Sequence, residues 1–214
     1  MLRVKQFIFN PFEESTYLLV DDKTRKAAVV DPGMFDAREN QIFDDFVKTH
    51  DIDLIEVINT HMHLDHCFGD NYVRDKYGVK VAANIGDAPF ASRIKEQCSR
   101  FGFKHDAKPV DIDVPLKDGD IITIGESSLT VITVPGHSMG GIALYSAPDK
   151  LLIAGDSLFR GSIGRTDLEG GNHTQLVDNV TKKLLTLPDD TNVLPGHGPF
   201  TTIGHERTSN PFLQ

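Results

Sequence analysis

Residues 59–70 have the sequence NTHMHLDHCFGD, which is the strongest signal in this chain. Three histidines and an aspartate, His61, His63, Asp65 and His66, fall within six consecutive positions. Packing gives no reason for such a cluster, because polar groups buried without partners cost several kcal/mol. Imidazole and carboxylate together form the ligand set of zinc, iron or manganese. The stretch therefore predicts a metal centre.

The spacing inside this stretch suggests two metals. His61 and His63 stand two apart at the exit of an expected strand, so their rings can converge on one point. Asp65 and His66 begin the next expected helix and can turn toward a second point. A site built for catalysis leaves one coordination position to water.

Three later residues extend the constellation. His137, Asp156 and His197 each follow a short apolar run and a glycine, in VPGH, AGD and LPGH, and the glycine permits a tight turn. The spacing suggests a first site of His61, His63 and His137, a second of Asp65, His66 and His197, and Asp156 as a bridge. Two-metal hydrolases place their ions about 3.5 to 4 Å apart, a span that one carboxylate bridges.

Strand-like and helix-like segments alternate along the chain. Apolar, β-branched runs predict strands at 17–20, 27–33, 53–63, 129–137, 150–156 and 192–197, and the start of the chain, 1–10, is charged and strand-like. Apolar residues three and four apart predict helices at 37–50, 70–78 and 174–187. This order predicts a layered α/β domain in which helices cover the sheets. Ligands of such domains bind beyond the carboxyl ends of the strands, where all seven candidate residues fall.

Composition sets the outer limits. The 214 residues are 39 % hydrophobic and 25 % charged, and no linker marks a boundary, so we expect one domain over 1–214. The net charge of −9 argues against a nucleic-acid partner. No apolar run approaches the roughly 18 residues of a membrane span. Two cysteines, Cys67 and Cys98, without an apolar leader predict free thiols and a cytoplasmic protein.

The pattern H-x-H-x-D-H, followed in order by Gly-His, Gly-Asp and Gly-His, resembles the signature of the metallo-β-lactamase fold, from about residue 4 to the C-terminus. The resemblance implies a four-layer αββα sandwich made of two similar halves, with two metals at one edge of the paired sheets. It also implies the division of ligands that the spacing suggests. Zinc is the expected metal, with iron or manganese as alternatives.

Details of the sequence favour one branch of that family. The main class of β-lactamases uses a cysteine ligand and lacks the bridging aspartate, whereas this chain has Asp156, and Cys67 is expected to be a small buried thiol. The segment at 155–171 resembles compact glyoxalase II-like hydrolases. The resemblance implies hydrolysis of a hydroxyacyl thioester such as lactoyl-glutathione by a metal-bridged hydroxide, which Asp65 would orient. A thiolate leaving group, with a thiol pKa of about 8.5, needs little help from a general acid.

Several residues bear on substrate recognition. Arg160 and Arg165 flank the GSIG loop after Asp156 and are candidates for binding a substrate carboxylate, with an ordinary ion pair as the alternative. Classical glyoxalase II carries a helical C-terminal domain that grips glutathione, whereas 17 residues follow His197, so we expect a weak grip on that carrier. A basic stretch is expected to be a solvated helical face; it consists of Arg93, Lys95, Arg100, Lys104 and Lys108, with Glu96 and Asp106 interspersed. Four isolated histidines are expected to be hydrogen-bonded loop residues and not ligands: His50, His105, His173 and His205.

Three other functions remain open from the sequence. A persulfide dioxygenase of this fold has a similar GRTD segment and uses one iron held by two histidines and a carboxylate. A phosphodiesterase, nuclease or lactonase of the same fold is the second, and the third is a binding protein without activity. Relatives of that last kind lose ligands, and this chain retains all seven positions. We expect a small anionic thioester as substrate, and the sequence leaves the oligomeric state open.

Overall fold

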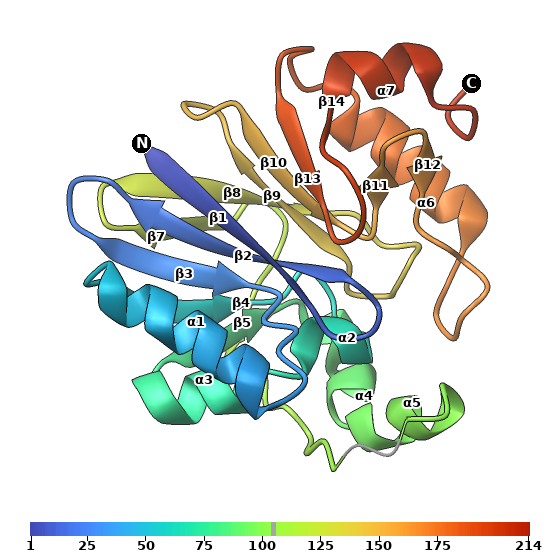
Figure 1. Ribbon diagram of the computed structural model, residues 1–214. Coiled ribbons are helices and arrows are strands. Elements are labelled where there is room, and N and C mark those ends of the chain that lie inside the picture. The colour runs from blue at the N-terminus through green and yellow to red at the C-terminus, as the bar shows by residue number, and fades with distance from the viewer. Residues whose placement is uncertain (104–105) are drawn as a thin grey trace.

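The computed structural model describes residues 1–103 and 106–214, so Lys104 and His105 lie outside the described residues. Two six-stranded mixed sheets pack face to face, and helices cover both outer faces (Figure 1). This is the predicted αββα sandwich. Each half of the chain supplies one sheet and the helices that cover it.

The first sheet has the order β1-β2-β3-β4-β5-β6. Its strands are β1 (Leu2–Phe9), β2 (Glu14–Asp21), β3 (Lys26–Val30), β4 (Asp53–Ile58), β5 (Lys80–Ala83) and β6 (Val114–Pro115). The pairs β1·β2 and β2·β3 are antiparallel, and β3, β4, β5 and β6 run parallel. Parallel neighbours need crossover connections, which the helices between them provide.

The second sheet has the order β14-β13-β10-β9-β8-β7. Its strands are β7 (Ile121–Ile124), β8 (Ser127–Thr133), β9 (Ile142–Ser146), β10 (Leu151–Gly155), β13 (Asn192–Pro195) and β14 (Thr201–Thr202). Only β10 and β13 are parallel. A short hairpin of β11 (Leu158–Phe159) and β12 (Ser162–Ile163) stands apart from this sheet.

The helices form two outer layers (Figure 1). The first half contains α1 (Ala37–Thr49), α2 (Leu64–Cys67), α3 (Asp70–Tyr77), η1 (Ile85–Asp87), α4 (Ala88–Ala91) and α5 (Ile94–Arg100), and the second contains α6 (His173–Asn179), η2 (Val180–Leu184) and α7 (Ile203–Ser209). Asp36 caps α1 by accepting hydrogen bonds from the backbone N–H groups of Arg38 and Glu39. No helix within the described ranges is long and apolar enough to cross a bilayer.

Three apolar clusters hold the layers together. The central cluster joins the facing sheets, and the outer two join each sheet to its own helices; representative members are Val30, Ile58 and Leu144 in the centre, Phe43, Val73 and Ile94 in one outer layer, and Leu176, Val180 and Ile203 in the other. Strand β3 is buried on both faces because it lies between α1 and the second sheet, which explains its continuous AAVV run.

The predicted elements match the structure closely. Every predicted strand overlaps an observed one, and α1 and α3 end within one residue of their predicted ends. The helix predicted at 174–187 is divided into α6 and the wider turn η2, and it stops at Leu184. Short elements such as β6, β11, β12 and β14 escaped prediction, since a two-residue strand has no periodicity to recognise.

Candidate metal centre

The cluster of residues 61–66 lies where β4 leaves the first sheet. His61 and His63 follow the strand in an extended loop, and Asp65 and His66 belong to the one-turn helix α2. All four side chains are buried. The sequence prediction of strand, loop and helix start is confirmed here.

The second sheet delivers the other three residues to the same edge. His137 follows β8, Asp156 follows β10 directly, and His197 follows β13. The glycine before Asp156, Gly155, has a φ of 49°, so a tight turn does require it. Gly196 serves differently, because a Cβ at that position would lie 2.2 Å from Asp156 Oδ1. There the glycine provides room.

Three histidines form the first group. His63 Nδ1 lies 2.9 Å from His137 Nε2, and His137 Nε2 lies 3.2 Å from His61 Nε2. These atoms can therefore hold one small cation between them, and they all lie within 4.8 Å of one another. The structure brings together the three residues that the sequence assigned to one site.

The second group is built around Asp65, His66 and His197. Asp65 Oδ2 lies 3.2 Å from His197 Nε2 and 3.7 Å from His66 Nε2. Asp156 faces both groups, because its Oδ1 lies 3.5 Å from His66 Nε2 and its Oδ2 lies 3.5 Å from His137 Nε2. This placement is what a bridging carboxylate requires.

Hydrogen bonds to the far side of each ring indicate which nitrogen carries the proton. A backbone carbonyl can only accept, so His137 Nδ1–H donates to Arg165 O at 2.7 Å and His197 Nδ1–H donates to Phe12 O at 3.0 Å. His66 Nδ1–H donates to Asp31 Oδ2 at 3.1 Å. In each neutral ring the Nε2 lone pair is then free for a metal, an assignment that rests on the network of partners.

His61 reaches the same state through Thr60. The Thr60 hydroxyl donates to Asp31 Oδ2 at 2.7 Å, so its oxygen can accept from His61 Nδ1–H at 3.1 Å. The Nε2 lone pairs of His61 and His137 consequently face each other. Within the described residues, 1–103 and 106–214, His66 Nε2 and Asp156 Oδ1 are buried without a hydrogen-bond partner. Repelling lone pairs and orphaned buried atoms in one place fit cations that share these ligands.

Burial and neighbouring charges shift the protonation of the cluster. Burial lowers the pKa of His61 well below 6.5 and that of His63 to about 3. Burial also opposes a charge on His66, but the carboxylates of Asp65 and Asp156 outweigh it and raise its pKa well above 6.5. His61 and His63 are thus neutral and ready for a metal, whereas at His66 a metal must displace a proton.

Two positioning carboxylates were missed by the sequence analysis. Asp31, at the end of β3, also accepts the Thr60 backbone N–H at 2.7 Å, so it orients both His66 and the loop that bears His61. Asp87 accepts from the backbone N–H of Met62 at 3.1 Å and from Ser138 Oγ at 2.8 Å, and it thereby ties the loops of the two sheets together. Asp31 follows a strand directly, a signal that could have been used, but Asp87 offers no local signal.

A cavity of about 350 Å³ opens over the cluster. Five of the seven candidate ligands line it, and the other wall residues are Phe12, Leu64, Phe101, Phe159, Arg165 and Leu168. The Arg165 guanidinium binds Asp167 in a bidentate ion pair at 2.7 and 2.8 Å, which is the alternative that the sequence left open. Arg160 is exposed and is absent from the cavity wall.

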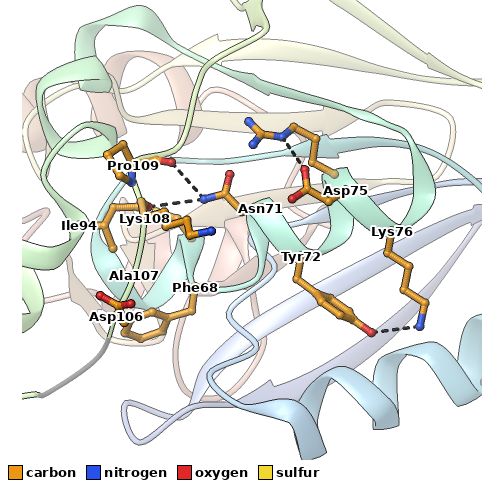
Figure 2. A pocket seen from close by; sticks show the side chains of 12 residues that line it. Phe68, Asn71, Tyr72, Asp75, Lys76, Ile94, Asp106, Ala107, Lys108 and Pro109 are labelled. Carbon is orange, nitrogen blue, oxygen red and sulfur yellow. Dashed lines mark hydrogen bonds and ion pairs between the residues drawn. The ribbon is translucent and has the colours of Figure 1, made fainter.

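A larger groove of about 750 Å³ lies elsewhere, between α3 and residues 106–109 (Figure 2). None of the seven cluster residues lines it. Cys67 is one of the residues that line this groove, and its buried thiol donates to His63 O at 2.8 Å, so the predicted role as a small buried thiol is confirmed. His50 and His205 lie at helices away from the cluster, as expected.

The basic stretch is less ordinary than predicted. Arg93 Nη2 and Arg100 Nη1 donate to the two oxygens of Glu169, at 2.7 and 2.9 Å. Both arginines also line a pocket beside the cavity, so this part of the stretch is more than a solvated face. Lys95 does fit the prediction, since it forms an exposed ion pair with Asp106.

Five histidines and two carboxylates at the edge of a helix-covered β-sandwich define a metallo-hydrolase. The model of the metallo-β-lactamase superfamily matches residues 10–197, and the chain belongs to that superfamily. Members of this superfamily bind divalent metals.

Three proteins are similar to this chain over nearly its whole length. The hydroxyacylglutathione hydrolase GloC of Haemophilus influenzae is 33 % identical, over 94 % of this chain and 93 % of that protein. The crystal structure of the B3 metallo-β-lactamase BLEG-1 has a TM-score of 0.90 and 34 % identity, over 99 % of this chain and 100 % of that one. The crystal structure of TTHA1623 in a di-iron-bound form has a TM-score of 0.85 and 31 % identity, over 98 % and 100 %.

Proposed function

We propose that this protein is a single-domain, dinuclear metallo-hydrolase that cleaves a hydroxyacyl thioester such as lactoyl-glutathione. The first metal would be held by His61, His63 and His137, the second by Asp65, His66 and His197, with Asp156 shared. Zinc is our first choice. Iron is an alternative because the similar TTHA1623 has a di-iron-bound form, and manganese is another because it also takes imidazole and carboxylate ligands. The similarity to GloC supports the substrate class.

Two bound cations would supply a nucleophilic hydroxide at neutral pH and polarise the acyl carbonyl. The chain itself provides orientation. Burial opposes a charge on Asp65, but the neighbouring histidines outweigh it and hold the pKa of Asp65 far below its usual value, so the carboxylate is ionised and would orient the attacking hydroxide by accepting its hydrogen bond. The hydroxide oxygen would form a bond to the acyl carbon as the carbon–sulfur bond breaks and its electron pair leaves on sulfur. The thiolate then takes the proton of the new carboxylic acid, and the products are a carboxylate and a thiol.

The make-up of the cavity wall carries the choice of thioester. Among the described residues that line it, the titratable side chains besides Arg165 are histidines and aspartates that the proposal assigns to the metals, so no separate general acid is left to protonate a leaving group. An amine leaving group needs such a proton, whereas a thiol with a pKa near 8.5 departs as the thiolate. This weighs against an amide or lactam substrate, although the similar BLEG-1 is a β-lactamase.

The direct test is thiol release from lactoyl-glutathione by purified, metal-loaded protein. We expect release that stops when a chelator removes the metal and resumes when zinc or iron returns. Cleavage of a β-lactam, a lactone or a phosphodiester with no thiol release would contradict the assignment.

One arrangement favours a second candidate, a persulfide dioxygenase with a single iron. His61, His66 and Asp156 place two imidazoles and a carboxylate within 4.8 Å of one another, which is the ligand set such an enzyme uses. Metal analysis and oxygen uptake separate the two functions. One iron per chain, with oxygen consumption and sulfite formation from glutathione persulfide, would select the dioxygenase.

A further inference from the structure

A side pocket of about 230 Å³ adjoins the cavity over the metal-ligand cluster. The two spaces share three wall residues, His63, Phe101 and Leu168. A substrate that reaches the cluster therefore has a neighbouring space into which one of its arms can extend. None of the functions discussed so far uses this pocket.

The inner part of the side pocket is apolar. Phe90 from α4 packs its ring 5.3 Å from the His63 ring, and Phe101 follows the end of α5. Leu168 approaches from the loop that follows β12. These surfaces suit the aliphatic stem of a ligand, whose burial is favourable by the area it removes from water.

The rest of the wall is charged, and its charges balance. Arg93 and Arg100 carry the positive charges, and Glu96 and Glu169 carry the negative ones. The two arginines lower the pKa of Glu169, so it is ionised at neutral pH. Two cations and two anions leave this wall without net charge. A ligand that matches it should also be neutral overall, yet carry charges of both signs.

Both the positive and the negative side chains of this wall can still form further hydrogen bonds. A guanidinium has five N–H donors. Within the part of the chain that the structure describes, Arg100 uses one of them in a hydrogen bond to Glu169. Glu96 is exposed and forms no ion pair within the described part of the chain. A ligand can thus gain charge-assisted hydrogen bonds without breaking the bridge between Arg93, Glu169 and Arg100.

Building on the proposed thioesterase function, we propose that the side pocket binds an arm of the substrate that ends in a zwitterionic α-amino-acid group. Its carboxylate pairs with Arg100 and Arg93, and its ammonium group pairs with Glu96 and Glu169. A simple anion would meet two carboxylates without a partner for them. An uncharged arm would cover the guanidinium donors without satisfying them, which costs free energy.

Binding of S-methylglutathione tests this proposal. This thioether carries the α-amino-acid group and cannot be hydrolysed as a thioester, and its N-acetyl derivative lacks the ammonium charge. Calorimetric titration of the metal-loaded protein should show tighter binding of S-methylglutathione than of the N-acetyl derivative. Equal binding of the two, or no binding of S-methylglutathione at millimolar concentration, overturns the proposal.

Two variants assign the effect to residues. Arg100→Gln should weaken binding of S-methylglutathione about tenfold, the loss expected for a partly exposed charge-assisted hydrogen bond. Glu96→Gln, which leaves the Glu169 bridge intact, should abolish the preference over the N-acetyl derivative. The control is Arg3→Gln, since Arg3 is an exposed arginine paired with Asp22 and absent from the pocket. Wild-type affinity in Arg100→Gln refutes the pocket assignment.

Hydrolysis is measured separately, so the two proposals can fail independently. The expected binding pattern without cleavage of any thioester would reject the proposed function and keep the pocket. Cleavage of lactoyl-glutathione with unchanged KM in Arg100→Gln would keep the function and reject the pocket.

Discussion

Replacing Asp31 by Asn tests whether the buried hydrogen-bond network prepares the histidines for metal. Asp31 has a φ of 51°, which Asn tolerates and which makes Ala a less suitable replacement. The change keeps the shape and removes an acceptor. Oδ2, which accepts from the Thr60 hydroxyl and from His66 Nδ1–H, would become an NH₂ group or would have to exchange with the oxygen that binds the Thr60 amide.

The size of the effect follows from those three bonds. An amide has one acceptor oxygen, so it cannot serve both His66 and the Thr60 backbone. The His66 proton then moves toward Nε2, the nitrogen that faces Asp156 at 3.5 Å, and this ligand is lost to the metal. Removal of such an outer partner typically costs 10- to 100-fold in metal affinity, or about 1.4 to 2.8 kcal/mol.

The assay is competition for zinc with a chelator of known affinity, together with the melting temperature of the metal-free protein. Asp21→Asn is the matched control. Asp21 is a buried aspartate that accepts from Thr24 N, Thr24 Oγ1 and Ser127 Oγ at 2.7 to 2.9 Å, away from the cluster. It should lower the melting temperature without changing zinc affinity. If Asp31→Asn binds zinc as the wild type does, the network does not set the state of the rings.

Four further outcomes follow from the site. Asp156→Ala should retain at most one tightly bound ion per chain by elemental analysis, and two retained ions would disprove the bridge. Arg165→Ala should reduce transition-state stabilisation, measured as the ratio of kcat/KM values, by only about 1 kcal/mol with unchanged metal content, because the guanidinium must leave its ion pair to bind substrate. Normal kinetics with a lower melting temperature would make Arg165 a structural residue. Since the pKa of His66 is raised well above 6.5, its charge stabilises the metal-free fold below pH 6.5, and this stabilisation is lost as pH rises through the raised pKa. The melting temperature of the metal-free protein should therefore fall as pH rises above 6.5, while metal affinity increases. Gly155→Ala should destabilise the fold by about 1–3 kcal/mol in denaturant titrations, because φ is positive and a Cβ would lie 2.3 Å from Thr60 Oγ1; wild-type stability would show that the loop relaxes freely.

Much of the fold could be predicted from local pattern. The AAVV run of β3 and the amphipathic segment that became α1 both signal their elements within a few residues, because strand and helix periods are local properties. Elements without such a signal were missed. The pair β11 and β12 has two residues per strand, and the one-turn helix α4 has no periodicity of its own.

In the candidate site, too, some residues have a local signal in the sequence and others have none. The side chains of the cluster could be chosen from the sequence because each follows a strand, and strand ends meet at one edge of the sandwich. Arg93 and Arg100 could not be placed there, since their partner Glu169 lies 76 and 69 residues further along the chain. Such a pairing arises only when α5 and the loop after β12 are packed together.

Residue types and their order along the chain thus specify the metal-binding chemistry, since ligand chemistry and turn glycines are properties of short segments. The protonation of each ring depends on the tertiary structure. The partner of His66 is 35 residues away, that of His137 is 28 residues away and that of His197 is 185 residues away. A hydrogen bond forms only within about 3 Å, and folding alone brings these atoms that close. The cavity and its charged side pocket have the same origin, because their walls come from both halves of the chain.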